Sequence, residues 1–177
     1  EICVEIGLPA GVLNIVHGLG ATTGNEIISS HEIDLVSFTG GTATGAHIAK
    51  IIAPKFKKMS LELGGKNPNI IFNDCDFEAA IKTSLNSSFA NQGQICLCGS
   101  RILVQRSVYD EVMAYMEPVV KAMHTGNPVD ESVDMGPLIS AIQRDRVKSF
   151  VPDGAPIAFQ GDAPTGNGFW FPPTVLA

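Results

Sequence analysis

Short apolar runs and longer stripes with helical spacing alternate along this chain. Five runs of four to six residues are typical of buried strands, at 12–16, 34–38, 58–63, 69–72 and 101–105. Apolar residues spaced three and four apart predict helices at 43–53, 77–89, 108–123 and 139–150. Strands that alternate with helices favour right-handed crossover connections and a parallel sheet. The pattern therefore predicts an α/β fold.

Polar residues mark where several of these elements begin and end. Asp74 or Asp76 can cap the helix at 77–89, because an aspartate side chain accepts hydrogen bonds from the free N–H groups of a first turn. Ser107 and Asp110 resemble a capping box before the helix at 108–123. The pair Gly64-Gly65 ends the run at 58–63, and we expect the boundary between two lobes there.

The composition argues against several classes of protein. Apolar residues make up 45% of the 177 residues and charged residues 17%, as in globular proteins, and the formal charge of −6 argues against a nucleic-acid or anionic-membrane surface. No apolar run reaches the roughly 18 residues of a membrane helix. We expect a soluble, cytoplasmic protein with no nucleic-acid or membrane partner. Because the chain starts at Glu1 inside a helical pattern, we also expect it to be a fragment.

The cysteines and histidines do not suggest a metal site. The four cysteines, at positions 3, 75, 96 and 98, are expected to be reduced thiols, since the chain shows no secretion signal. Cys96-Leu97-Cys98 is too short for a C-x-x-C redox loop, and the four histidines are scattered. No metal ligand set is predicted.

Two polar motifs that flank apolar segments contain candidate catalytic residues. Glu62 opens Glu-Leu-Gly-Gly-Lys-Asn-Pro, and Cys96 ends Asn-Gln-Gly-Gln-Ile-Cys. A thiolate attacks an electrophilic carbon, and a nearby carboxylate can take a proton from that thiol or from a later water. The alternatives are a solvated turn residue for Glu62 and a small buried hydrophobe for Cys96. The two can act together only if the fold brings them to one cleft.

A glycine pair follows the run at 34–38 and opens the next helix. Gly40 and Gly41 leave room for a phosphate at the helix N-terminus, where free N–H groups and the helix dipole favour an anion. A strand–glycine–helix joint also occurs where nothing binds, so this motif alone leaves both interpretations open.

Taken together, the motifs resemble the aldehyde dehydrogenase superfamily. Residues 38–45 are similar to its F-T-G-S-T-x-x-G, residues 61–68 to its L-E-L-G-G-K-x-P, and residues 91–96 to its N-Q-G-Q-x-C. Residues 8–16 and 126–128 also match, so the resemblance extends over essentially the whole chain. The run 87–98 is similar to the muconic-semialdehyde branch of the family.

The resemblance implies oxidation of a small-molecule aldehyde to a carboxylic acid with NAD or NADP, NAD being favoured. Cys96 would be the nucleophile that forms a thiohemiacetal and then a thioester, and Glu62 the general base. The implied cofactor-binding residues are Thr39, Gly40, Gly41, Thr42, Gly45, Leu63 and Gly64.

The resemblance also implies a domain organisation. Residues 1–63 would be the C-terminal part of a Rossmann-like NAD(P)-binding domain, and residues 64–177 the N-terminal part of a second α/β lobe that carries the nucleophile. The parent protein would be a homodimer or homotetramer.

The chain departs from the family pattern in two respects. Gly41 replaces the motif's usual serine, so one side-chain donor to the pyrophosphate is missing. The family's upstream Asn, its ribose-binding Lys and Glu, and its downstream E-x-F-G-P motif are also absent, so we expect the isolated chain to lack a complete cofactor site. The alternatives are a non-catalytic module of the same fold and a CoA-acylating relative, although Glu62 at the base position favours water as the acceptor.

Overall fold

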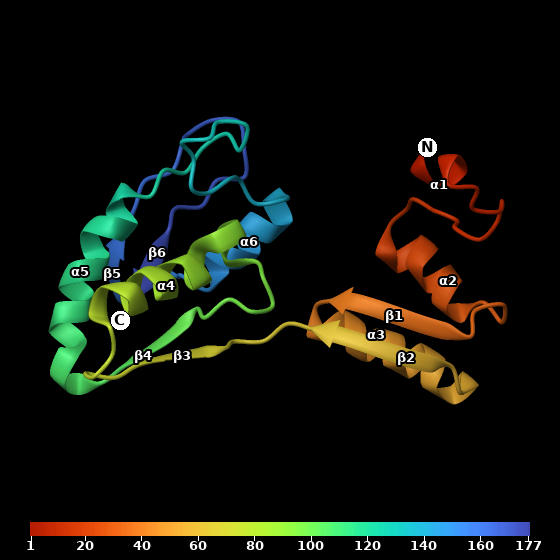
Figure 1. Cartoon of the computed structure of the whole chain (residues 1–177), viewed down its shortest axis with the longest axis horizontal. Coiled ribbons are helices and arrows are strands. Elements are labelled where there is room, and N and C mark those ends of the chain that lie inside the picture. The colour runs from red at the N-terminus through yellow and green to blue at the C-terminus, as the bar shows by residue number, and fades with distance from the viewer. The chain divides into compact units, whose positions relative to one another are not determined.

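The computed structural model describes residues 1–177, which form two compact units, Glu1–Gly64 and Gly65–Ala177 (Figure 1). Each unit contains a pair of parallel strands joined by a helix, which confirms the predicted α/β class. The assignment of the two units as cofactor-binding and nucleophile-bearing parts stays a prediction. The longest helix has 14 residues, so no helix here could span a bilayer.

The first unit is built on the strands β1 and β2. Its elements are α1 (Ile2–Glu5), a π-helical turn (Gly20–Gly24), α2 (Asn25–Ser29), β1 (Leu35–Gly40), α3 (Thr42–Ile52), a 3-10 turn (Ala53–Lys55) and β2 (Lys58–Leu63). β1 and β2 are parallel, with Leu35 opposite Lys58 and Gly40 opposite Leu63, and α3 is the connection between them. A cluster of isoleucine and valine side chains forms the core: Ile28, Val36, Ile48 and Ile52.

Two lysines stabilise α2. Lys55 Nζ donates a 2.6 Å hydrogen bond to the carbonyl oxygen of Ser29, and Lys57 Nζ donates to the carbonyls of Ile28 and Ser30. These carbonyls end α2, where a helix leaves its acceptors unpaired and its dipole favours cations. Lys55 and Lys57 therefore cap the carboxyl end of α2.

The second unit repeats the strand–helix–strand pattern and adds a hairpin-like pair. Its elements are β3 (Pro68–Ile71), α4 (Phe77–Phe89), a 3-10 segment (Ala90–Gly93), β4 (Arg101–Val104), a 3-10 turn (Arg106–Val108), α5 (Tyr109–Ala122), α6 (Ala141–Ser149), β5 (Ile157–Gln160) and β6 (Thr174–Leu176). β3 and β4 are parallel, and β5 and β6 are antiparallel (Figure 1). Asp76 caps α4 by accepting a hydrogen bond from the N–H of Ala79, as predicted for one of the two aspartates.

The core of the second unit lies where α4 and α5 pack on its strands. Ile81, Val112 and Val120 have no exposed surface. Other buried side chains complete the cluster: Ile71, Leu85, Met116 and Phe159. Phe77 and Tyr115, on α4 and α5, stack edge to face with ring centroids 5.8 Å apart. This packing holds α4, and with it the segment that leads to Cys96.

The strand predicted at 12–16 is wrong. No strand pairs with this segment, and Val12, Leu13, Ile15 and Val16 are all more than half exposed. An apolar run becomes a buried strand only where a neighbouring strand pairs its N–H and C=O groups. Here only the N–H of Val12 is paired, with the carbonyl oxygen of Pro9, and the Asn14 side chain donates to the carbonyl oxygen of Gly11.

The start of α5 also differs from the prediction. Ser107 lies in the 3-10 turn before α5, the N-cap is Val108, and no side chain caps the helix, so the capping box is wrong. The tight turn moves the start of α5 beyond the reach of Ser107. The buried face consists of Val112, Met116 and Val120, while Val119 remains exposed.

We expect Ile81→Ala to destabilise the chain strongly. Ile81 is fully buried at the centre of the second core, and removing such a side chain costs about 2–5 kcal/mol of unfolding free energy. Chemical denaturation measures this change. Thr83→Ala, an exposed substitution on the same helix, should change the free energy by no more than about 0.5 kcal/mol. Equal stability of the two variants would contradict the core described here.

Candidate active site

The carboxyl ends of β1 and β2 bring two predicted site residues together. Thr39 lies opposite Glu62 in the parallel register, and Gly40 lies opposite Leu63. Ligands of open parallel sheets bind beyond the carboxyl ends of the strands. The side chain of Glu62 is exposed at this edge, which is a suitable place for a carboxylate that exchanges protons with a bound molecule.

The start of α3 lies at the same strand ends. Gly41 is the N-cap residue, with φ −70° and ψ 144°, and no side chain caps the helix. The first N–H groups of α3 have no acceptor within the helix. A Cβ placed on Gly41 would have no heavy atom within 4 Å, so open space faces this turn. The turn therefore has the donors and the room that an anionic group requires.

Gly45 sets the distance between α3 and β2. A Cβ at this position would lie 2.6 Å from Cδ2 of Leu63, closer than such atoms approach. The missing side chain lets the helix approach the end of β2. Four of the seven predicted cofactor residues, Thr39, Gly40, Gly45 and Leu63, are thus grouped by register or contact. Gly41 caps α3, Thr42 begins it, and Gly64 follows β2.

The loop that carries Cys96 has an unusual backbone. Asn91 and Gln92 have φ values of 49° and 55°, and Gly93 follows with φ 69°. Left-handed conformations cost free energy in residues with a Cβ, and they persist where the surroundings enforce them, often at functional sites. This run turns the chain from the end of α4 toward Cys96, whose side chain is exposed.

Side chains from neighbouring elements hold this loop. Asn67 Nδ2 donates to the carbonyl oxygens of Cys96, at 2.6 Å, and Cys98, at 3.3 Å. The N–H of Gly99 donates to Ser87 Oγ at 3.0 Å, and Ser88 Oγ lies 3.1 Å from the carbonyl oxygen of Gly99. The loop is therefore anchored both at Cys96 and where it enters β4.

Gln92 connects the loop to a more distant segment. We orient the carboxamide of Gln92 so that each of its contacts pairs a donor with an acceptor. Its oxygen then accepts a hydrogen bond from the N–H of Gly136 at 3.1 Å, and its nitrogen donates to the carbonyl oxygen of Asn91 at 3.0 Å. The sequence motif indicated Cys96 but did not indicate these holding roles of Asn67, Ser87 and Gln92. The one indication of such a role in the sequence was that Asn67 lies within the motif at 61–68.

The two predicted catalytic residues belong to different units. Glu62 is part of the unit that ends at Gly64, and Cys96 is part of the unit that starts at Gly65. Their meeting in one cleft stays a prediction. Cys98 is buried, with 5% of its surface exposed, in keeping with a packing role. No group of three or more His, Cys, Asp or Glu side chains is close enough to hold a metal ion.

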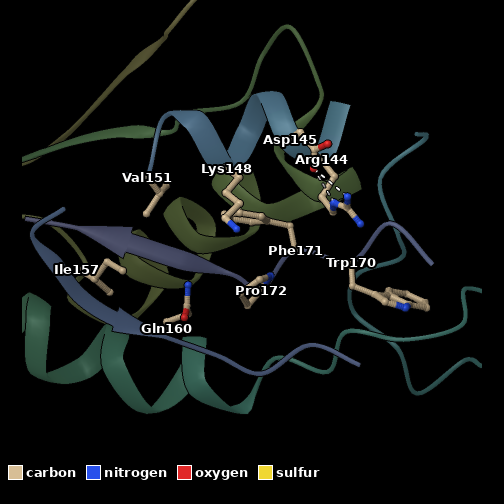
Figure 2. A pocket seen from close by; sticks show the side chains of 9 residues that line it. All are labelled: Arg144, Asp145, Lys148, Val151, Ile157, Gln160, Trp170, Phe171 and Pro172. Atoms are coloured by element: carbon tan, nitrogen blue, oxygen red, sulfur yellow. Dashed lines mark hydrogen bonds and ion pairs between the residues drawn. The ribbon is translucent and has the colours of Figure 1, made fainter. Parts of the chain in front are cut away.

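The second unit also contains an open hollow of about 470 Å³ (Figure 2). Trp170 and Phe171 form part of its wall, and Lys148 projects into it. Arg144 also lines the hollow, but its guanidinium bonds Oδ1 of Asp145 through Nε at 3.0 Å and Nη2 at 2.9 Å. The lining contains no thiol or hydroxyl side chain and no residue of the Cys96 loop, so we assign no part of the site chemistry to this hollow.

The fold and the two motif-bearing loops define a member of a known family. The model of the aldehyde dehydrogenase family matches residues 1–177, and this chain belongs to that family. This confirms the resemblance inferred from the motifs.

Individual relatives support the same assignment. The chain is 41% identical over 185 residues to betaine aldehyde dehydrogenase of Bacillus subtilis, which covers 100% of the chain and 38% of the relative. It is 48% identical over 151 residues to 2-aminomuconic semialdehyde dehydrogenase of Danio rerio, which covers 85% and 31%. The chain therefore spans about a third of the length of these relatives.

A solved structure shows the same fold. Betaine aldehyde dehydrogenase from Staphylococcus aureus, in complex with NAD+, matches with a TM-score of 0.90 and 42% sequence identity, covering 97% of this chain and 35% of that one. The similarity therefore includes nearly all of the strands and helices described above.

We expect Gly93→Ala to disturb the Cys96 loop. The substitution adds a Cβ at φ 69° and 2.9 Å from the carbonyl oxygen of Ser88, a backbone atom that cannot move freely. Strain of this kind costs about 1–3 kcal/mol. Thermal or denaturant unfolding measures the loss. Gly65→Ala, whose Cβ would meet only one atom at 4.0 Å, is the matched control, and a Gly93→Ala variant as stable as this control would contradict the loop geometry.

Proposed function

We propose that this chain is part of an enzyme that oxidises an aldehyde to a carboxylic acid, with Cys96 as the nucleophile and Glu62 as the general base. The observation that carries the proposal is the exposed Cys96 thiol on a loop that is held in left-handed backbone conformations and anchored by Asn67. Membership of the aldehyde dehydrogenase family supports the same reaction.

Cys96 has the surroundings that its role requires. The thiolate would add to the aldehyde carbon, forming a C–S bond while the carbonyl oxygen becomes an oxyanion. The backbone N–H of Cys96 makes no hydrogen bond within the chain, so it is free to donate to that oxyanion. The product of this step is a thiohemiacetal on Cys96.

The residues at the start of α3 fit the phosphates of NAD(P)+. Gly41 faces open space, the helix N-terminus has unpaired N–H donors, and Gly45 keeps α3 close to β2. When bound, the nicotinamide would accept a hydride from the thiohemiacetal carbon, leaving a thioester on Cys96. Thr39, beside Glu62 in the register, would border the nicotinamide. Gly41, Thr42 and Gly45 would surround the phosphates.

Glu62 would complete the reaction by taking a proton from the water that attacks the thioester. This attack releases the carboxylic acid and restores the Cys96 thiol. Glu62 and Asn67 lie five positions apart in one sequence motif, and Asn67 is hydrogen-bonded to Cys96. The carboxylate therefore belongs to a segment that is tied to the nucleophile loop.

The substrate class is the finer part of this proposal. Several relatives are named muconic semialdehyde dehydrogenases, which agrees with the similarity of the run 87–98 to that branch. Because betaine aldehyde dehydrogenase is also a relative, turnover of a muconic semialdehyde and of betaine aldehyde should be compared directly.

Selective labelling and substitution test the catalytic pair. Iodoacetamide should modify Cys96 before the partly buried Cys3 and Cys75 and the buried Cys98.

With the natural flanking sequence present, Cys96→Ala should lower kcat by at least about 10³-fold, since the nucleophile is lost. Glu62→Gln should lower kcat by about 10²–10⁴-fold, the usual contribution of a general base. Equal labelling of all four thiols, or an active Cys96→Ala variant, would refute the proposal.

A single substitution tests the phosphate site. Gly41→Ser places a hydroxyl at an N-cap position with suitable backbone angles and free space, so it should add one hydrogen bond to the bound cofactor. One such bond of about 0.5–1.5 kcal/mol corresponds to a roughly 2–10-fold lower Kd for NAD(P)+, which calorimetry can measure with the natural flanking sequence present. Gly41→Ala, which has no hydroxyl, is the control. If the serine and alanine variants have the same Kd, this position does not face the phosphates.

A further inference from the structure

We propose that Asn67 is a positioning residue that fixes the nucleophile for reaction, an inference that rests on the proposed function. Its carboxamide nitrogen lies 2.6 Å from the carbonyl oxygen of Cys96 and 3.3 Å from that of Cys98. Carbonyl oxygens only accept hydrogen bonds, so the nitrogen rather than the oxygen of the carboxamide must face them. One side chain therefore holds two points of the loop, on either side of Leu97.

The backbone that carries this side chain is itself restrained. Asn67 precedes Pro68, and a residue before proline is confined to extended conformations. Pro68 begins β3, where it is in register with Arg101 of the parallel strand β4. The Cys96 loop leads directly into β4, so Asn67 extends from the start of one strand to the segment that enters its neighbour. The backbone of Asn67 is therefore restrained by Pro68 and β3, independently of the hydrogen bonds that its side chain makes with the loop.

The two hydrogen bonds act on the atoms that orient the thiol. Holding the carbonyl of Cys96 restricts rotation about its Cα–C bond, and the second bond, to Cys98, restricts the two residues that follow. The backbone position of Cys96, from which its thiol projects, is then restrained relative to β3. Reactions of bound groups depend steeply on such alignment, and a displacement of about 1 Å can lower a rate by about 10²-fold.

Asn67 also connects the nucleophile loop to the segment that begins at Glu62. Glu62 and Asn67 lie in one short stretch of sequence, with Gly64 and Gly65 between them. The base stands at one end of this stretch, and the residue that holds the nucleophile stands at the other. This motif therefore contains both the proposed base and the residue that holds the nucleophile loop.

The experiment compares two asparagines that differ in their contacts. Asn67→Asp keeps the size of the side chain but replaces the donor with a carboxylate that faces two carbonyl oxygens. Asn67→Ser retains a shorter donor. Asn69→Asp is the matched control, because Asn69 lies two positions further on, is also partly buried, and its side chain makes no hydrogen bond.

Three readouts separate positioning from folding, all measured with the natural flanking sequence present. They are the rate of NAD(P)H formation in the first turnover, the KM for aldehyde, and deuterium exchange of the 95–98 backbone. Asn67→Asp should lower the first-turnover rate by about 10–100-fold with KM changed less than about threefold, and it should accelerate exchange at Cys98. Asn67→Ser should give an intermediate rate, and Asn69→Asp should stay within about twofold of the unsubstituted protein in rate.

Each other outcome has a definite meaning. A first-turnover rate for Asn67→Asp that equals that of Asn69→Asp overturns the inference. A parallel loss of rate and a parallel acceleration of exchange in both variants also overturns it, because Asn67 would then be only a folding contact. An active Cys96→Ala variant instead overturns the proposed function. The positioning inference alone fails when Cys96→Ala is inactive and Asn67→Asp is unimpaired.

Discussion

The conformation of the loop from Asn91 to Cys96 is the constraint on which the proposed chemistry depends. Three successive residues have positive φ, and two of them carry a Cβ that resists this conformation. The free energy of that strain is offset by the hydrogen bonds of Asn67 and Ser87 and by the packing of α4 into a core that includes Ile81. A loop held in this way presents an exposed thiol in a defined direction, which an unrestrained cysteine would not do.

The first unit has its own constraint, the close approach of α3 to β2. Gly45 lets the helix approach Leu63, and the parallel register places Thr39 beside Glu62. These short distances group the candidate cofactor residues and the base at one edge of the sheet. Because Gly41 leaves its cap position open, the binding of a phosphate there would rely on backbone N–H groups rather than on a side chain.

Individual elements show how far local pattern predicts this fold. β2 has the bounds predicted from its apolar run, and α4 begins at a predicted aspartate cap, because both depend on short-range spacing. The apolar run at 12–16 has the same local pattern as β1 but forms no strand, because strand formation requires a pairing partner. Ser107 failed as a cap because the preceding turn is 3-10, and the exact start of a helix depends on such turns.

Periodicity and contiguous motifs were enough to predict the α/β class and the aldehyde dehydrogenase family, and they indicated Cys96 and Glu62 as the candidate catalytic pair. Only the tertiary structure showed that Asn67 bonds the Cys96 and Cys98 carbonyls, that Gln92 bonds Gly136, and that Gly45 fits against Leu63. These contacts join residues separated by about 20 to 45 positions in the chain. Sequence spacing cannot specify such pairs, because the folding of the strands and helices decides which of them meet.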